Sequence, residues 1–142
     1  MKISDVLRSK GTMVVTIRPD ETVERLLEML DDRGIGALVV SEDGNTVGGI
    51  VSERDVVRQL RRRGSEVLAG PVSEIMTREV TTCSPDDDVE SLAGTMTMQR
   101  IRHVPVLDDG RLSAIVSIGD IVKHRISDLQ AERDHLAGYI QQ

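Results

Sequence analysis

The sequence predicts a mixed α/β (α+β) fold made of two copies of one β-α-β-β-α unit, with a C-terminal helix after the second copy. The strings "GIVSERD" (49–55) and "AIVSIGD" (114–120) each join an apolar run to Ser-x-x-Asp. "TIRPDETV" (16–23) matches "TCSPDDDV" (82–89), and "IGALVV" (35–40) matches "IRHVPV" (101–106), at nearly the same offset. Repeats at a fixed offset indicate a duplicated structural unit.

The first half of each unit predicts a strand and then a helix. A short apolar stretch, Met13 to Ile17 in one copy and Val80 to Cys83 in the other, predicts the strand. Proline and acidic residues follow, and acidic side chains stabilise a helix N-terminus. In the first copy the next apolar residues lie on one face of a helix, namely Val23, Leu26, Leu27 and Leu30.

The second half of each unit predicts a β-hairpin and another helix. The pairs Asp43-Gly44 and Asp109-Gly110 are strong hairpin signals. The flanking apolar runs predict strands at 37–40 and 48–52, and again at 103–107 and 112–117. A helix then begins at or just after the Ser of each Ser-x-x-Asp string.

These elements divide the chain into two repeats, at 1–64 and 72–126, which form one compact module. The string "GSEVLAGP" (64–71) has glycines and a proline that favour a linker, assigned to 65–71, and 127–142 is a helical extension. The last helix is expected from about 119 to 140, and its apolar stripe, which Arg133 interrupts, must pack against this chain's flank or a second copy. Three heptads with a charge in the seam do not predict a stable isolated coiled coil. The stripe consists of Val122, Ile126, Leu129, Leu136 and Ile140.

Composition excludes several classes of function. The chain has 142 residues, a net charge of -6, one Tyr and no Trp or Phe. An acidic chain almost without aromatic rings is a poor match for nucleic acid, which proteins bind with basic faces and stacked rings. No apolar run is long enough to span a bilayer, so no membrane contact is expected. The single cysteine, Cys83, fits a reducing compartment, and the location expected is the cytoplasm.

The repeated Ser-x-x-Asp string has two interpretations. Ser52 and Asp55, like Ser117 and Asp120, have the spacing of a helix capping box. A helix N-terminus is also an anion site, where the hydroxyl could donate to a phosphate and the carboxylate could accept from a ribose diol. The capping box prefers the longer Glu or Gln at its last position, which favours the ligand interpretation.

The doubled unit, the Gly-apolar-apolar-Ser-x-x-Asp string and the Ile-x-x-apolar-Pro-Val run together resemble a pair of CBS domains, the Bateman module. The resemblance covers residues 1 to about 126. It implies two repeats packed sheet to sheet about a pseudo-twofold axis. It also implies a cleft between them for an adenosine-containing ligand, AMP, ADP or ATP in the first place and NAD or S-adenosylmethionine as alternatives.

The resemblance also implies roles for particular residues. Asp55 and Asp120 match the ribose-binding Asp, with Ser52 and Ser117 near the phosphate or ribose. The remaining matches lie on the first strand, the segment lining the base and the phosphate side. They are Thr16 and Thr82, and the segments Ile35, Gly36, Ala37 and Ile101, Arg102, His103 with Pro105 of the same run. Without aromatic rings, the adenine would lie between aliphatic side chains such as Ile35, Ile101 and Ile118.

The two copies differ in ways that bear on ligand choice. Arg54 in the first copy corresponds to Gly119, and Arg102 in the second copy corresponds to Gly36. The cationic groups are thus complementary, and a phosphate in a shared cleft could contact Arg54 from one copy and Arg102 or His103 from the other. On this comparison the second-copy site is the better nucleotide site.

The expected function is a non-enzymatic regulatory module, a homodimer whose nucleotide-induced change an effector protein reads. The alternative is a ligand-independent structural or protein-interaction module in which both strings are only caps. An enzyme has little support, because no nucleophile, base and oxyanion donors come together in the sequence. No metal site is expected, Cys83 is expected in the core, and Arg58 with 61–63 is expected as a solvated helix end.

Overall fold

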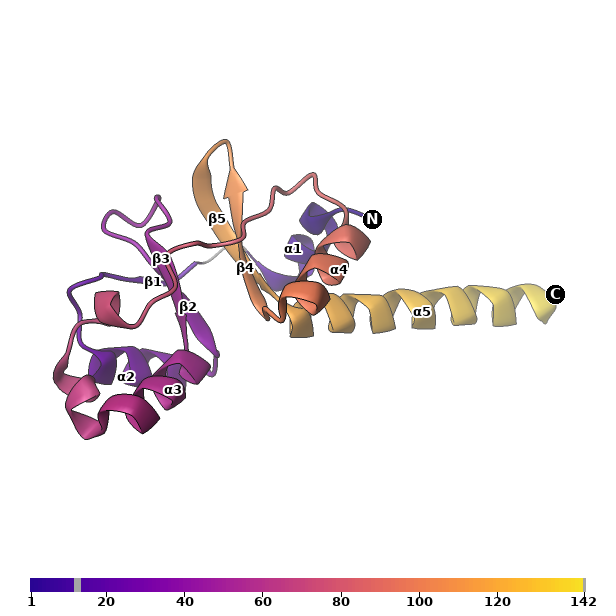
Figure 1. Cartoon of the computed structure of the whole chain (residues 1–142). Coiled ribbons are helices and arrows are strands. Elements are labelled where there is room, and N and C mark those ends of the chain that lie inside the picture. Colours follow the sequence, from indigo (N-terminus) through magenta and orange to yellow (C-terminus); the bar gives the residue numbers. More distant parts are fainter. Residues whose placement is uncertain (12–13, 142) are drawn as a thin grey trace.

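The computed structural model describes residues 1–11 and 14–141 and has the mixed α+β fold predicted from the repeats (Figure 1). Met13, where the first strand was expected to begin, lies outside the described residues. In the first copy the elements are α1 (Ile3–Lys10), β1 (Thr16–Ile17), α2 (Val23–Arg33), β2 (Ala37–Val40), β3 (Gly49–Ser52) and α3 (Glu53–Arg63). Then follow the 3-10 turns η1 (Ser65–Ala69) and η2 (Val72–Glu74), α4 (Val89–Gln99), β4 (His103–Asp108), β5 (Arg111–Ser117) and α5 (Ile118–Ile140).

The strands of both copies lie in the middle of the molecule and the helices lie outside them (Figure 1). One sheet has the order β1-β2-β3, with β1 parallel and β3 antiparallel to β2, and the other is the antiparallel pair β4-β5. Backbone contacts join the copies along these sheets. Ile50 forms a bridge with Thr77, and the Leu112 amide donates to the Asn45 carbonyl at 2.8 Å.

The strand predicted at Val80 to Cys83 is reduced to a single parallel bridge between Cys83 and Val106. The Cys83 amide donates to the Pro105 carbonyl at 3.0 Å, and its carbonyl accepts from the Leu107 amide at 2.8 Å. Extending this ladder toward the N-terminus would need a hydrogen bond from the backbone N of Pro105, which proline lacks. In the first copy Val39 holds the corresponding position, and Thr16 pairs with it in β1.

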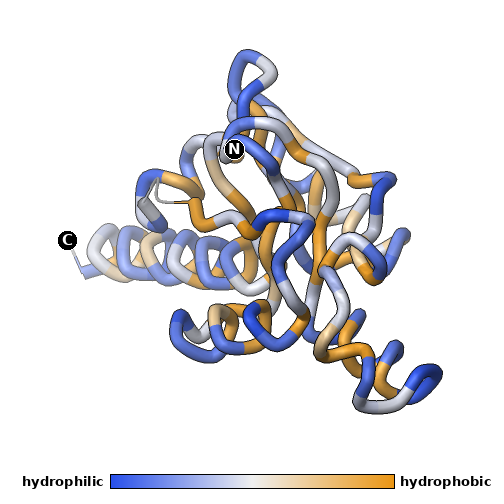
Figure 2. The backbone as a smooth tube through the Cα atoms, turned by 90° about the vertical axis from the view of Figure 1, so that its left-hand side faces the viewer, coloured by the Kyte–Doolittle hydropathy of each residue, from blue (hydrophilic) through white to orange (hydrophobic). Residues whose placement is uncertain are grey.

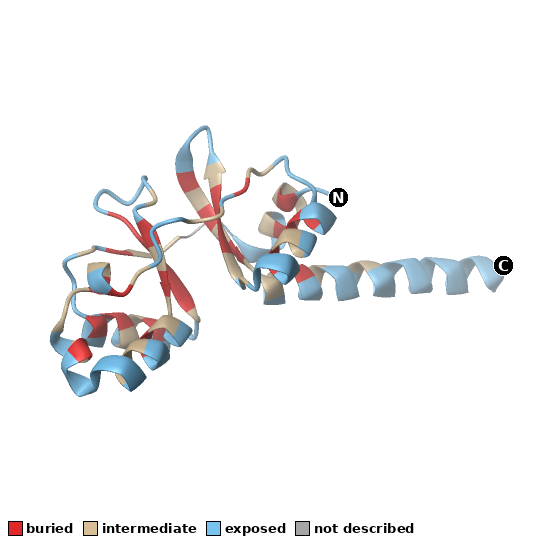
Figure 3. Cartoon of the chain, viewed as in Figure 1, coloured by how far each residue is buried: buried red, intermediate tan, exposed pale blue. Residues whose placement is uncertain are grey.

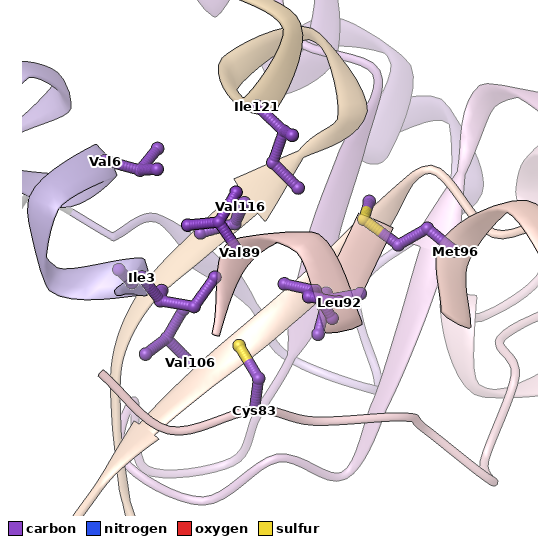
Figure 4. Close-up of a cluster of buried hydrophobic side chains, with 11 residues drawn as sticks. Ile3, Val6, Cys83, Val89, Leu92, Met96, Val106, Val116 and Ile121 are labelled. Carbon is purple, nitrogen blue, oxygen red and sulfur yellow. The ribbon is translucent and has the colours of Figure 1, made fainter. Parts of the chain in front are cut away.

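Each copy has its own hydrophobic core, but the leading segments are exchanged. Ile3 and Val6 of α1 pack with second-copy residues such as Leu92 and Val116 (Figure 4). Val72 and Ile75, from the leader of the second copy, belong to the first-copy core. The sequence does not predict this exchange, because the leader strings match each other and do not indicate which core they enter.

The segment predicted as a linker is ordered and packed. η1 places Val67 in the first-copy core, where the residue is 1% exposed. Backbone hydrogen bonds then fix the end of the segment, from the Val23 amide to the Gly70 carbonyl at 3.0 Å and from the Val72 amide to the Glu21 carbonyl at 2.8 Å. The segment that connects the copies, 65–71, is therefore packed against α2 and α3.

The hairpins differ although both carry Asp-Gly. In the second copy Asp109 and Gly110 have φ values of 52° and 79°, which fits a two-residue type I′ turn between β4 and β5. In the first copy a longer loop, 41–48, separates the strands. There the Asp43 carboxylate accepts from the amides of Asn45 and Thr46, and these hydrogen bonds lower its pKa to about 2.

The long helix α5 leaves the body of the protein after its first turns (Figures 1 and 3). Ile121 is buried, while every residue from 129 to 141 is exposed. In the described ranges, 1–11 and 14–141, no helix combines the length and apolar character needed to cross a membrane.

Candidate functional site

Both Ser-x-x-Asp strings form the predicted capping box at a strand-to-helix junction. Asp55 Oδ2 accepts from the Ser52 amide at 2.8 Å and from its hydroxyl at 3.0 Å, while the Asp55 amide donates to Ser52 Oγ at 3.3 Å. At the start of α5, Asp120 Oδ2 accepts from the Ser117 amide at 2.9 Å, and the Asp120 amide donates to Ser117 Oγ at 3.1 Å. Capping thus explains the spacing in both copies.

Capping leaves part of the Asp55 carboxylate available. The hydrogen bonds that its carboxylate accepts both use Oδ2, and within residues 1–11 and 14–141 no protein donor meets Oδ1. A carboxylate has about four acceptor positions, so one side chain can both cap α3 and accept from a ligand hydroxyl. The two interpretations of the string are therefore compatible at Asp55.

A cavity of about 310 Å³ lies beside Asp55, between the two copies. Its volume is within the range of small-molecule sites. One wall comes from the ends of β2 and β3 and the start of α3, with Gly36, Ala37, Ile50, Ser52, Glu53, Arg54, Asp55 and Arg58. The opposite wall comes from the second copy, with Thr77, Glu79, Val80, Thr81, Gln99, Arg100, Ile101, Arg102 and His103.

The cavity has a basic side made by both copies. Arg54 and Arg58 come from α3, whereas Arg100 and Arg102 come from the end of α4 and the segment before β4. In the described part of the chain, no carboxylate lies within 4.0 Å of any of these four guanidinium groups. Unpaired guanidinium groups bind phosphate oxygens well because their planar donors match that geometry.

Backbone contacts fix the segments that carry the basic side. The Ile118 amide donates to the Arg102 carbonyl at 2.9 Å, and in the first copy the Glu53 amide donates to the Gly36 carbonyl at 3.0 Å. The segment before β2 is thus tied to the start of α3, and the segment before β4 is tied to the start of α5. The backbone of Arg102 is thus anchored to the start of α5, and its side chain lines the cavity together with that of Arg54.

His103 lies where the two copies meet. A Cβ added to Gly36 would be 3.5 Å from His103 Cε1 and 3.3 Å from Glu53 Oε1, so the imidazole lies against first-copy backbone. Burial lowers the pKa of His103, and the nearby charges of Lys10 and Arg102 lower it further, against the opposing carboxylates of Asp120 and Glu53. The neutral imidazole is therefore favoured at this interface.

Asp120 has different neighbours from Asp55. Lys10, at the end of α1, reaches it and donates from Nζ both to Asp120 Oδ2 and to the Ile115 carbonyl. The two side chains are 32% and 24% exposed, so the pair is partly shielded from water. Burial raises the pKa of Asp120, but the hydrogen bonds from Lys10 and Ser117 outweigh burial, and the net pKa is lowered.

The structure brings together eight of the fifteen residues proposed from the sequence. These eight line the cavity, namely Gly36, Ala37, Ser52, Arg54, Asp55, Ile101, Arg102 and His103. The other seven do not line it, namely Thr16, Ile35, Thr82, Pro105, Ser117, Ile118 and Asp120. The cavity thus lies at the first-copy junction, whereas the sequence comparison favoured the second-copy one.

The residues outside the cavity have clear positions. Thr16 begins β1. Thr82 lies just before the bridge at Cys83, and the two residues that precede it, Val80 and Thr81, line the cavity. Pro105 is buried inside β4. The aliphatic residues expected around the adenine are divided, because Ile35 lines a separate groove beside α2 and Ile118 lines one that it shares with Ile101.

Several cavity residues were not predicted from the sequence, although the position of Arg100 carries a signal that indicates it. Arg100 ends α4 with φ 56° and ψ 39°, the left-handed conformation that Gly34 adopts at the end of α2. This conformation disfavours a side chain such as arginine by ~1 kcal/mol, so an arginine at an expected glycine position is notable. Arg58, assigned to a solvated cluster, is exposed as expected and also lines the cavity, and Arg61, Arg62 and Arg63 are exposed as well.

Cys83 lies in the second-copy core, as predicted, and is 7% exposed (Figure 4). Burial, together with the nearby Asp87 carboxylate, raises the pKa of its thiol to about 11. A thiol with that pKa is not a nucleophile at neutral pH. In the part of the chain that the structure describes, no three His, Cys, Asp or Glu residues are placed to hold a metal ion.

Known proteins support the same organisation. The family model for the CBS domain matches residues 3–62 and 72–127. The CBS domain-containing protein CBSX3, mitochondrial, of Arabidopsis thaliana is 35% identical over 147 residues, covering 98% of this chain and 71% of that protein.

Two solved structures are similar to the whole module. The CBS-domain containing protein ATU1752 from Agrobacterium tumefaciens is 40% identical, with a TM-score of 0.85, covering 88% of this chain and 99% of that one. The CBS domain pair of protein MJ0100, solved in complex with 5'-methylthioadenosine and S-adenosyl-L-methionine, is 26% identical with a TM-score of 0.77, covering 87% and 98% of the two chains. The two family matches, the doubled fold and the cavity between the copies agree, and this chain belongs to the CBS-domain family as a tandem CBS pair.

Proposed function

We propose that this chain is a non-enzymatic regulatory module that binds an adenine nucleotide in the cavity beside Asp55. The observation that carries the proposal is the composition of that cavity, which joins Asp55 of one repeat to Arg102 and His103 of the other. The solved complex of the MJ0100 pair, whose two ligands both contain adenosine, supports the same ligand class.

The side chains around the cavity suggest an orientation for the nucleotide. Asp55 can accept from the ribose hydroxyls, while Ile50, Val80 and Ile101 offer apolar surface to the base. The phosphates would then contact the four cavity arginines, whose combined positive charge exceeds the negative charge of a single phosphate. We therefore favour AMP, ADP or ATP over S-adenosylmethionine, whose sulfonium is positive.

A ligand held by both repeats can act as a regulator. Because one wall comes from each copy, a change in their relative position alters the site, and a ligand that fits one arrangement better shifts the population toward it. An effector protein or a second copy of the chain would read that shift. A cytoplasmic location belongs to the same proposal, although the relative CBSX3 is named as mitochondrial.

The alternative is a ligand-independent interaction module, and the two complete capping boxes favour it. A thermal-shift and calorimetry panel of AMP, ADP, ATP, S-adenosylmethionine, NAD and NADH separates the two functions. A ligand that binds only the folded state raises the unfolding midpoint by mass action. We expect an adenine nucleotide to do so with one equivalent per chain, whereas no shift with any ligand would support the interaction module.

A further inference from the structure

The last helix, α5, carries an apolar stripe that no described part of the chain covers. Its members are 49% to 81% exposed, although each is a large aliphatic residue, namely Val122, Ile126, Leu129, Leu136 and Ile140. Figure 3 shows the helix exposed along most of its length, and Figure 2 shows apolar segments alternating with polar ones along it. Contiguous exposed apolar surface of this kind marks an interaction site.

The exposed half of the helix has little support of its own. Residues 129–140 have no buried member, and isolated helices shorter than ~12–15 residues are marginal in water. Helices in proteins gain most of their stability from packing an apolar face. A helix with such a face and nothing against it therefore implies a partner.

The stripe lies on the flank of α5, not on the side that meets the body. Ile121 is buried, and His124 and Asp128 are partly buried, so these residues mark the side toward the second copy. At 100° per residue, the stripe is about a third of a turn away from them. It remains accessible to another molecule while α5 keeps its contacts with α1 and α4.

The spacing of the stripe fits another helix. Val122, Ile126 and Leu129, then Arg133, Leu136 and Ile140, alternate steps of four and three residues, which is the seam of a two-stranded coiled coil. We propose that this seam pairs with the same seam of a second copy of the chain, in antiparallel orientation.

Arg133 determines the orientation. In a parallel pair it would face Arg133 of the second copy, which places like charges in an apolar seam. In an antiparallel pair centred between 129 and 133, it faces Leu129 of the second copy instead. The arginine stem packs on that leucine, and the guanidinium reaches the carboxylate of Glu132, which borders the seam.

The same register is favourable along the rest of the helix. It places Ile126 against Leu136 and Val122 against Ile140, so that all remaining layers are aliphatic. The helix dipoles of the two copies also oppose each other, which is the favourable arrangement. This pairing does not depend on the nucleotide cavity, so its test stands apart from that of the proposed function.

The first test is the oligomeric state of the full 142-residue chain, measured by sedimentation equilibrium or light scattering. We expect a dimer, and Leu129→Glu should raise its dissociation constant by ~100-fold or more, since two buried leucines are replaced by charges. Ala131→Glu adds the same charge on the opposite side of α5 and should leave the dimer intact. A monomeric wild type, or an equally tight Leu129→Glu dimer, would overturn the proposal.

The second test is the orientation, measured by disulfide cross-linking. A mixture of Ile126→Cys and Leu136→Cys chains should cross-link, because the register places these residues opposite each other, whereas neither variant alone should do so efficiently. The native Cys83 is buried and does not compete. Self-linking of Leu136→Cys would show a parallel pair, and a mixture that fails to cross-link would exclude the register. Circular dichroism and thermal unfolding check that each variant is folded.

Discussion

The two Ser-x-x-Asp junctions cap their helices in the same way but have different surroundings. At Asp55 the junction opens into a cavity lined by arginines from both copies. At Asp120 a lysine from α1, 110 residues away in the chain, holds the carboxylate. The cap depends on residues three positions apart, so duplication preserves it. The environment depends on residues brought from the other end of the chain, so it is free to diverge.

The largest expected effect separates the two carboxylates. Asp55→Asn should weaken adenine nucleotide binding ~100-fold, because hydrogen bonds to a charged group contribute about 1.5–3 kcal/mol and Asn presents a neutral group. Asp120→Asn should leave the affinity within about threefold, since Asp120 does not line the cavity. Isothermal titration calorimetry with AMP and ATP measures both.

Thermal unfolding provides the control for this pair. Both variants alter a capping box, so each should lower the free energy of unfolding by ~1 kcal/mol. Asp120→Asn should lose about 1 kcal/mol more, because it also removes the ion pair with Lys10. A larger loss of affinity in Asp55→Asn, the less destabilised variant, would assign the binding difference to the cavity. Equal losses of affinity would instead place Asp120 in the nucleotide site.

The next contrast is between Gly49 and Ala114, the equivalent positions of the two strings. A Cβ at Gly49 would lie 2.8 Å from Met76 Sδ and 2.9 Å from the Thr77 carbonyl, so the glycine is needed for close approach of the backbone. Gly49→Ala should cost ~2 kcal/mol, within the range for overpacked sites. Ala114→Gly should cost ~1 kcal/mol, through the flexibility of glycine in a strand. Denaturant unfolding measures both, and a neutral Gly49→Ala would contradict the contact.

The pair between Lys10 and Asp120 should contribute about 1 kcal/mol, as a partly shielded ion pair. We expect Lys10→Met to lose that amount at pH 7, and Lys2→Met, which removes an exposed contact to Asp86, to lose almost nothing. The folded pKa of Asp120 is lowered, so its contribution is complete above the ordinary carboxyl pKa and is lost as pH falls through the lower folded value. Wild type and Lys10→Met should therefore converge in acid, as urea unfolding at several pH values would show.

Most of the fold could be predicted from the sequence because it rests on local signals. The hairpin strand 37–40, the strand at 103–107 (103–108 in the structure), the Ser52 cap of α3 and the length of α5 follow from apolar spacing, Asp-Gly turns and capping residues. The strand before β4 was predicted from the same kind of run, but Pro105 removes the hydrogen bond that would extend it. That loss becomes visible only once the partner strand is known.

Part of the cavity lining could also be predicted, because the two copies can be compared position by position. Arg54 and Arg102 were paired across the copies from their complementary positions, and the cavity contains both. The preference for Asp120 could not be checked from the sequence, since nothing near it indicates that Lys10 approaches. The exchange of leading segments brings Lys10 there, because α1 packs on the second copy.

The smallest expected effect concerns His103, at the contact between the copies. Its pKa is lowered chiefly by burial, so the unfolded chain binds a proton there at a higher pH than the folded chain. Stability should then fall as the pH drops below about 6.5, the ordinary pKa of histidine, and level off below the folded value. His103→Gln should remove this pH dependence. The stability change that it accounts for should be smaller than the ~1 kcal/mol expected for the Lys10 pair. His135→Gln, an exposed change on α5, should leave it intact. A slope that persists unchanged in His103→Gln would show that the imidazole does not titrate with folding.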